Sequence, residues 1–214
     1  MKILALDTSA EFASIAALDG DELTEVLLHS PDGFAHQIFT HFETLLRRVG
    51  WTIDQVDAFG AASGPGSFTG VRVALSAMKG LAESLGKPVI AVSNLEAIAA
   101  LSQAPLRAPL LDARRGEVYG AVYNSDLRIV VPETVGKFQD WLQTVPTEAE
   151  FLVQDPTPFA NLLPREPRVV PRALAGAVAR ITRDRLQTGL SGDPVTADAN
   201  YVRRADAELK WTDR

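Results

Sequence analysis

The chain has 214 residues, of which 46% are hydrophobic and 22% charged, and its formal net charge is −6. This length and composition predict an ordinary globular protein with one large domain or two small ones. The sequence contains no cysteine, which excludes disulfides, thiolate metal sites and a cysteine nucleophile. Its apolar runs are too short for a signal peptide or for a membrane-spanning helix of roughly 20 residues, so we expect a cytoplasmic protein that does not enter a membrane.

Charge is distributed unevenly along the chain. Residues 1–164 contain 11 basic and 20 acidic residues, whereas residues 165–214 contain 10 basic and 7 acidic residues. The acidic main body is predicted to bind nucleic acid poorly unless it makes specific contacts. We interpret the basic C-terminal tail as a solvated helix face, with contact to RNA or to an acidic partner as the alternative.

The first 103 residues carry strand and helix signals in the order βββαβαβα. Three short apolar segments separated by turn residues predict an antiparallel meander. Later segments alternate between apolar strands and runs with helical spacing, which predicts parallel strands in a mixed sheet with helices packed against it. The expected strands are 2–7, 12–18, 23–28, 56–62 and 89–92, and the expected helices are 35–49, 70–85 and 94–101.

From residue 104 a similar order of signals begins again. The apolar segment 106–111 ends at Asp112 and is followed by a polar turn and a second predicted strand, just as the first strand of the chain ends at Asp7. We interpret this similarity as a degenerate internal repeat and divide the α/β chain into an N-terminal lobe, 1–103, and a smaller C-terminal lobe, 104–214. The remaining expected strands are 117–123, 127–131 and 151–153, and the remaining expected helices are 138–143 and 173–186.

A glycine-rich loop, Ser63 to Gly70, separates a predicted strand from a predicted helix. It contains three glycines and a proline in eight residues, which predicts a tight turn. Ser67 or Thr69 is expected to cap the helix, and free N–H groups at a helix start attract anions. The sequence therefore allows two interpretations, a turn that packs on a neighbouring segment or a nucleotide or anion site. The residues of that site would be Asp7, Thr8, Ser9, Ser67, Thr69 and Gly70.

Other patterns of catalytic chemistry are incomplete. Two strand-end carboxylates, Asp7 and Asp112, match the layout of actin-like ATPases, but the alternative is that each only caps a turn. Asp112 is followed by Ala-Arg-Arg, without the hydroxyl residues of a phosphate hairpin, so we do not expect a complete ATP site. His29, His36 and His41 do not have the spacing of a metal pair, and the Gly-x-Ser-x-Gly motif of serine hydrolases is absent.

The two long predicted helices, 35–49 and 70–85, carry apolar residues on more than one face. Small residues in the second helix would let another helix approach closely, so we predict an interface with a partner or a second copy. The alternative is that both faces are internal core. If the interface prediction is right, Ala74→Arg or Met78→Glu would break the contact without unfolding the chain. The predicted interface residues are Ile38, Phe42, Leu45, Val71, Ala74, Leu75, Met78 and Leu81.

Five segments of the chain form a set of motifs: 4–9 (LALDTS), 64–72 (GPGSFTGVR), 92–96 (VSNLE), 112–119 (DARRGEVY) and the tail at 201–208. Together these segments resemble the bacterial TsaB family, also called YeaZ. The order and spacing of the motifs agree over residues 1–123, and the combination is specific. The resemblance implies an actin-like (ASKHA, ribonuclease H-like) fold of two related lobes, each with a mixed sheet flanked by helices.

The resemblance also implies a function in tRNA modification. A TsaB-like protein would be a non-catalytic scaffold that supports TsaD, the subunit that transfers a threonylcarbamoyl group to adenosine 37 of tRNAs reading codons that begin with A. TsaE would be the ATPase partner, and TsaC would supply threonylcarbamoyl-AMP. No cofactor is then expected on this chain, since ATP and a metal ion would bind to partner subunits. The resemblance further implies that tRNA is reached through the complex and that the isolated chain forms a homodimer.

The sequence departs from the catalytic relative at one place. That relative carries a His-x-x-x-His metal pair, whereas this chain has Ser-Asn-Leu-Glu-Ala at 93–97. We therefore expect no metal-dependent transferase centre here, which favours the scaffold function and the packing interpretation of the glycine loop. The alternative function is a self-sufficient ATP-dependent transferase or a glycoprotease-like peptidase, for which we find no nucleophile–base pair.

Overall fold

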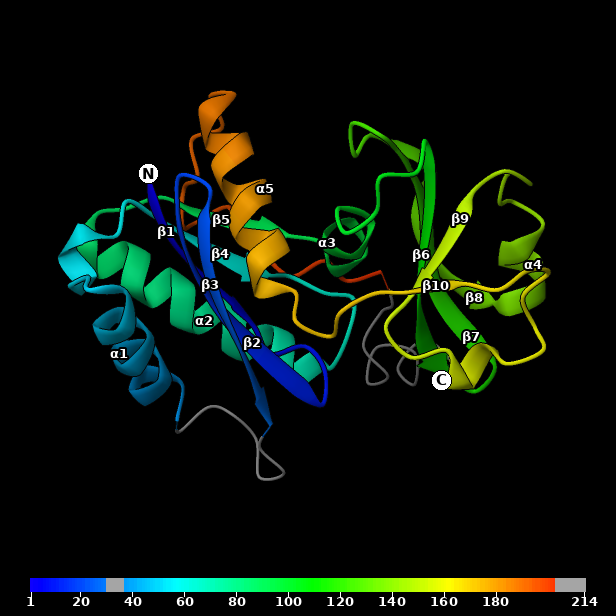
Figure 1. Ribbon diagram of the computed structural model, residues 1–214, viewed down its shortest axis with the longest axis horizontal. Coiled ribbons are helices and arrows are strands. Elements are labelled where there is room, and N and C mark those ends of the chain that lie inside the picture. Colours follow the sequence, from blue (N-terminus) through cyan, green and yellow to red (C-terminus); the bar gives the residue numbers. More distant parts are fainter. Residues whose placement is uncertain (30–36, 203–214) are drawn as a thin grey trace, which may run out of the picture. The chain divides into compact units, whose positions relative to one another are not determined.

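The computed structural model describes residues 1–29 and 37–202, and the chain forms two compact units (Figure 1). Unit 1 contains residues 1–97 and 171–199, and the described part of unit 2 contains residues 98–170 and 200–202. The start of the expected helix 35–49, His36 and residues 203–214 of the predicted basic tail lie outside the described residues.

The sheet of unit 1 has the strand order β3-β2-β1-β4-β5. β1 pairs antiparallel with β2 and parallel with β4, so a meander continues into parallel strands, as predicted. The bounds agree closely with the expected segments because turn residues delimit each strand. The strands are β1 (Lys2–Asp7), β2 (Phe12–Asp19), β3 (Glu22–His29), β4 (Ala58–Ala62) and β5 (Val89–Val92).

Helices cover both faces of this sheet. α1 (Ile38–Val49) and α2 (Phe68–Leu85) pack on the face that includes Leu4 and Leu6 of β1. The opposite face is covered by α5 (Ala175–Gln187), since a Cβ built on Gly60 of β4 would lie 2.6 Å from Thr182 Oγ1. The alternation of side chains along each strand therefore gives unit 1 two apolar layers, one on each side of the sheet.

The position of α5 differs from the predicted division of the chain. Sequence order placed everything after residue 103 in the C-terminal lobe, but residues 171–199 belong to unit 1. The physical reason is the contact of α5 with the first sheet, where the Ser14 hydroxyl of β2 accepts hydrogen bonds from the backbone N–H groups of Leu174 and Ala175. Such contacts between distant segments leave no local signal in the sequence.

Unit 2 has its own five-stranded sheet, with the order β10-β9-β6-β7-β8. The short helix α4 (Phe138–Leu142) contributes Phe138 and Trp141 to its core. β8 is longer than the expected strand 127–131, and β10 was not predicted, because proline-rich sequence surrounds this two-residue strand. The strands are β6 (Leu106–Arg114), β7 (Glu117–Asn124), β8 (Ile129–Lys137), β9 (Glu150–Val153) and β10 (Arg168–Val169).

The two sheets have the same topology, which confirms the predicted internal repeat. In unit 1 the meander β1-β2-β3 is extended on its other side by the parallel strands β4 and β5. In unit 2 the meander β6-β7-β8 is extended in the same way by β9 and β10. Strand β6 is thus the counterpart of β1, and the β6–β7 turn is the counterpart of the β1–β2 turn.

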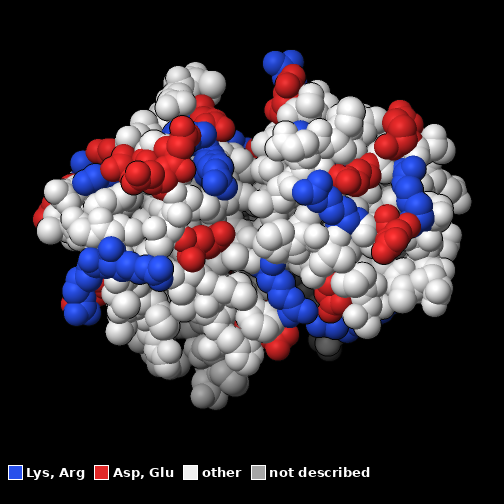
Figure 2. Space-filling model, viewed as in Figure 1, with Lys and Arg blue, Asp and Glu red and all other residues white. Residues whose placement is uncertain are grey.

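The remaining elements are short. They are α3 (Asn94–Ala99), which follows β5, and the 3₁₀ turns η1 (Ile53–Gln55) and η2 (Thr157–Phe159). In the part of the chain that the structure covers, no helix combines the length and the apolar character needed to cross a membrane. The face seen in Figure 2 carries interspersed acidic and basic side chains.

Candidate functional site

The glycine-rich loop connects the end of β4 to the start of α2. Ser67 is the N-cap of α2, and its hydroxyl accepts a hydrogen bond from the backbone N–H of Gly70 at 3.3 Å. Its carbonyl accepts the N–H of Val71 at 2.9 Å, so the helix begins at Phe68. The predicted cap is therefore confirmed at Ser67.

This loop packs directly on the turn that follows β1. The N–H of Ser67 donates to the carbonyl of Ser9 at 2.7 Å, and the hydroxyl of Thr8 donates to the carbonyl of Gly70 at 2.6 Å. A Cβ built on Gly70 would lie 1.9 Å from the Thr8 carbonyl oxygen, and one built on Gly66 would lie 2.6 Å from the Ser9 carbonyl oxygen. The glycines are required because the two backbones approach too closely for any side chain.

Asn94, the first residue of α3, joins the same contact. Its Oδ1 accepts the N–H of Gly64 at 3.0 Å, and its own N–H donates to the Gly64 carbonyl at 2.8 Å. Its Nδ2 donates to the hydroxyl of Ser9. Asn94 is 2% exposed, so the side chain links the glycine loop and the β1–β2 turn inside the fold. No local pattern in the sequence indicates this link, because Asn94 lies 85 residues from Ser9 and 30 from Gly64.

Asp7 ends β1 beneath this turn and is 1% exposed. Its Oδ1 accepts the N–H of Ser9 at 2.9 Å. Burial raises the pKa of the Asp7 carboxyl, the bond to Ser9 opposes that effect, and the nearby Glu25 carboxylate adds to it. The carboxyl group thus caps the turn, which was the simpler of the two interpretations of the strand-end aspartate.

The structure brings together five of the six residues of the predicted anion site. Asp7, Thr8, Ser9, Ser67 and Gly70 contact one another, whereas Thr69 is exposed on the first turn of α2. Hydrogen bonds within the chain join these residues, and backbone occupies the space beside Gly66 and Gly70. These contacts support the packing interpretation, and anion binding at this loop stays a prediction.

The start of α3 also bears on the expected lack of a metal centre. Glu96 is 8% exposed and pairs with Arg185 of α5 at 2.5 Å, and Arg185 also donates to the carbonyl of Ala91 at 3.0 Å. Among the residues described, no three His, Cys, Asp or Glu side chains are grouped as metal ligands would be. Residues 93–97 thus connect α3 to α5 through an ion pair.

The predicted interface residues are mostly core residues. Seven of them are buried with relative exposures of 7% or less, and Leu81 is half-buried against the same apolar cluster. The interface prediction is corrected for this reason: α1 and α2 use these side chains to fill the apolar space over the sheet. Ala74→Arg and Met78→Glu would bury a charge in a site that is 0% exposed, so both variants would unfold the chain rather than test an interface. The buried residues are Ile38, Phe42, Leu45, Val71, Ala74, Leu75 and Met78.

A different set of residues remains exposed on α2. They recur every three or four positions and form one face, which we call the α2 outer face. Its members are Phe68, Arg72, Ser76, Gly80 and Glu83. The signal in the sequence was the run of small residues itself, but only the packed structure shows which of them point away from the sheet.

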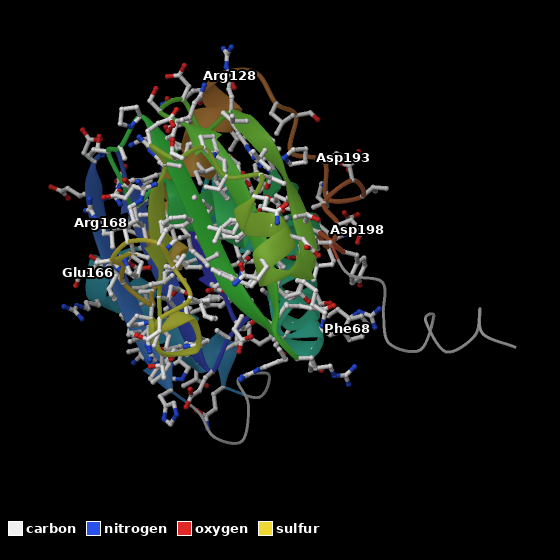
Figure 3. All side chains as sticks on the ribbon, turned by 90° about the vertical axis from the view of Figure 1, so that its right-hand side faces the viewer. Phe68, Arg128, Glu166, Arg168, Asp193 and Asp198 are labelled. Atoms are coloured by element: carbon white, nitrogen blue, oxygen red, sulfur yellow. The ribbon has the colours of Figure 1, made fainter. Side chains whose placement is uncertain are left out.

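The α2 outer face begins with an aromatic residue and continues with small ones. Phe68 is 44% exposed (Figure 3), and the guanidinium of Arg72 lies 3.8 Å from its ring centroid. Further along, a Cβ built on Gly80 would meet no atom of the described chain within 4 Å. Phe39 on α1 is another exposed aromatic residue, with a relative exposure of 60%.

Comparisons with known proteins agree with this fold and these motifs. Residues 32–169 match the family described as TsaD, tRNA N6-adenosine threonylcarbamoyltransferase. The chain is 31% identical to the tRNA threonylcarbamoyladenosine biosynthesis protein TsaB of Bacillus subtilis, over 99% of this chain and 98% of that protein. It is 36% identical to the protein of the same name from Haemophilus influenzae, over 68% of this chain and 62% of the relative.

Solved structures give the same result. The YeaZ structure from Pseudomonas aeruginosa superposes with a TM-score of 0.78 and 27% identity, over 94% of this chain and 99% of that one. A second Pseudomonas aeruginosa structure, described as similar to the peptidase YeaZ, has a TM-score of 0.80 with the same coverage. With its two repeated sheets, its glycine loop and these relatives, the chain belongs to the TsaB (YeaZ) family.

Proposed function

We propose that this chain is a non-catalytic subunit in the synthesis of N6-threonylcarbamoyladenosine in tRNA, and that it binds the transferase subunit TsaD through the α2 outer face. The names of its relatives support the pathway, since they are tRNA threonylcarbamoyladenosine biosynthesis proteins. In this proposal the modified base is adenosine 37, TsaE is a further partner, and ATP and a metal ion bind to the partner subunits. The complex acts in the cytoplasm, and the isolated chain forms a homodimer through the same face.

The observation that carries the proposal is Gly80. A glycine inside a helix costs roughly 0.5–1 kcal/mol relative to alanine. Other helix-packed glycines of this chain are explained by neighbours, as at Gly176, whose Cβ would lie 2.8 Å from Leu23, but Gly80 faces open space. A partner helix that approaches closely would account for it, because small residues bring helix backbones together.

The neighbours of Gly80 are suited to such a contact. Ser76 and Glu83 lie on the same face, and the exposed ring of Phe68 lies at one end of that face. An aromatic anchor beside a small-residue surface is typical of interfaces between subunits. The surface that docks would thus be separate from the core residues that fold unit 1.

The glycine loop supports the non-catalytic part of the proposal. Two donors that could hold a phosphate at the end of β1 are bonded within the chain: the Ser67 N–H donates to the Ser9 carbonyl, and the Thr8 hydroxyl donates to the Gly70 carbonyl. A self-sufficient transferase, the alternative function, would have to break these bonds in order to bind ATP there. A peptidase would need an activated nucleophile, which these contacts do not provide.

The test is Gly80→Arg in the full chain. Because Gly80 faces open space and arginine favours the helix more than glycine does, we expect the variant to unfold at or above the wild-type temperature and to lose co-elution with TsaD in size-exclusion chromatography. Gly80→Ala should remain folded and still bind TsaD. In isolation its free energy of unfolding should exceed that of the wild type by roughly 0.5–1 kcal/mol. Gly136→Arg is the matched control, since Gly136 in β8 also has nothing within 4 Å among the described residues.

Two results would contradict the proposal. If Gly80→Arg still co-elutes with TsaD, the α2 outer face is not the docking surface. If the isolated wild-type chain hydrolyses ATP or modifies tRNA without partners, the chain is an enzyme in its own right and the alternative function replaces the scaffold.

A further inference from the structure

The β6–β7 turn of unit 2 is built from two arginines and a glycine in left-handed backbone conformations. The φ angles are 66° at Arg114, 57° at Arg115 and 73° at Gly116. β6 and β7 pair with Arg114 opposite Glu117, so Arg115 and Gly116 form the two-residue hairpin loop. Positive φ at both loop positions is the pattern of a type I′ turn, in which asparagine and glycine are favoured.

Arginine is an unfavourable choice for these positions. A side chain with a Cβ is strained at positive φ, and arginine lacks the short polar group that lets asparagine adopt this conformation. The strain is held in place by the surroundings, since the N–H of Arg114 donates to Asp112 Oδ1 at 2.8 Å and the register shifts between Asp112 and Arg114. Strained residues that persist in this way are often those whose side chains have a function.

The turn also gathers a third cation. Lys137, at the end of β8, donates from Nζ to the carbonyl of Arg115 at 3.4 Å, and all three basic residues are exposed. Asp112 offsets part of the charge, because its Oδ2 lies 3.4 Å from Arg114 Nη1. Glu117 adds a second carboxylate, since it lies opposite Arg114 on β6 and opposite Lys137 on β8, so the three cations of the turn outnumber its two carboxylates by one.

The equivalent turn of unit 1 is buried under the glycine loop, with Thr8 2% and Ser9 4% exposed. In unit 2 the same position of the repeat is open and basic. The whole chain has a net charge of −6, which repels polyanions such as nucleic acids. A polyanion would therefore bind this chain at a local basic site. A hairpin loop with exposed arginines suits phosphate groups, because one guanidinium can donate two parallel hydrogen bonds to two phosphate oxygens.

We propose that the β6–β7 turn, through Arg115, Arg114 and Lys137, contacts the phosphate backbone of RNA. The proposal rests on the proposed function, which supplies tRNA as the RNA. It assigns to this chain a direct contact with the substrate of the complex, whereas the family resemblance implied that tRNA is reached through the complex. The contact would position the RNA and carry no base specificity, since phosphate contacts do not read sequence.

The experiment measures binding of a fluorescein-labelled tRNA anticodon stem-loop by anisotropy, with the full chain alone and with its complex with TsaD, over a series of salt concentrations. Arg115→Asn is the main variant, because asparagine tolerates the left-handed backbone and should leave the fold intact or more stable. Lys137→Gln is the second variant. Arg128→Gln is the matched control, since Arg128 is an exposed cation at the β7–β8 turn, at the other end of the same meander (Figure 3).

We expect Arg115→Asn and Lys137→Gln each to weaken RNA binding about fivefold, with Arg128→Gln near wild type. The slope of log affinity against log salt should fall by about 0.8 for each contact removed. Co-elution with TsaD should not change. This combination distinguishes a phosphate contact from a change in folding, because the unfolding temperature of Arg115→Asn should equal or exceed that of the wild type.

Three outcomes would overturn the proposal. Unchanged RNA affinity and salt slope would show that the turn does not bind RNA, and normal co-elution with TsaD would then leave the proposed function standing. Loss of co-elution with unchanged RNA binding by the isolated chain would make the turn a protein contact. Competition by free ATP as strong as competition by unlabelled stem-loop would make it a nucleotide site. Failure of the wild-type chain to bind TsaD would count against the proposed function alone.

Discussion

At the scale of single residues, Asp7 shows how a polar group is used inside unit 1. Its carboxyl is buried and bonded to the Ser9 N–H, and its pKa is raised chiefly by burial. Folded Asp7 therefore holds its proton to a higher pH than unfolded Asp7 does. Its contribution to stability is fully present below the pKa of the unfolded chain and is lost as the pH rises through the raised pKa of the folded state.

Asp7→Asn tests this linkage. The amide oxygen can still accept the Ser9 N–H, and the cost of burying a charge is removed, so we expect the variant to unfold at a higher temperature than the wild type at pH 7. The difference should shrink as the pH falls below the ordinary range of carboxyl groups. Calorimetry over a pH series measures it, with the exposed Asp54→Asn as control. A variant that is less stable than the wild type at pH 7 would show that the charge itself holds the turn together.

At the scale of secondary structure, α5 depends on capping from another element. Its N-cap residue, Leu174, has no side chain that can accept a hydrogen bond. The Ser14 hydroxyl of β2 accepts the N–H groups of Leu174 and Ala175 at 3.0 and 2.9 Å, and Glu25 of β3 accepts that of Gly176 at 2.7 Å. The first sheet thus supplies the acceptors that the start of this helix lacks.

Ser14→Ala should therefore destabilise the chain. The variant leaves two buried N–H groups without their acceptor, which we expect to cost about 1–3 kcal/mol in the free energy of unfolding. Urea denaturation followed by circular dichroism gives this value. Ser84→Ala is the matched control, because Ser84 is exposed and bonds only within α2. Equal stability of Ser14→Ala and Ser84→Ala would mean that Ser14 does not anchor α5.

At the scale of the whole molecule, the chain leaves unit 1 within α3 and returns at residue 171 to complete it. The segment after α5 runs along β5 and α2, where the Val89 N–H donates to the Gly192 carbonyl at 2.8 Å and Lys79 Nζ donates to the Ala197 carbonyl at 2.7 Å. Ala197 belongs to the apolar cluster under α1 and α2 and is 5% exposed. Unit 1 is therefore closed by residues near the end of the sequence.

Ala197→Asp tests how much this segment contributes. A carboxylate placed in the cluster should destabilise the chain by about 2–4 kcal/mol, because a buried charge without a partner is costly. Val195→Asp is the control within the same segment, since Val195 is 81% exposed and its substitution should change stability by no more than about 0.5 kcal/mol. The thermal unfolding temperatures of the two variants, compared with that of the wild type, measure this difference in stability. Similar stability of both would show that residues 188–199 only lie on the surface.

The sequence by itself determined most elements of this protein, although not β10, and the kind of fold they make. Turn residues delimited the strands of the meander, helical spacing located α1 and α2, and the two expected cap residues, Ser67 and Thr69, included the observed cap Ser67. The similarity around Asp7 and Asp112 correctly indicated a repeat, which the equal topology of the two sheets confirms. These features are local, so short stretches of chain carry their signals.

Only the tertiary structure decided which of these residues face inward. Periodicity found the apolar residues of α2 but assigned Ala74 and Met78 to an interface, whereas packing on the sheet buries them and leaves Gly80 outside. The bond of Asn94 to Ser9 and the return of α5 to the first sheet join segments 80 or more residues apart. Burial and pairing at such distances depend on how the elements pack together, which no local pattern records.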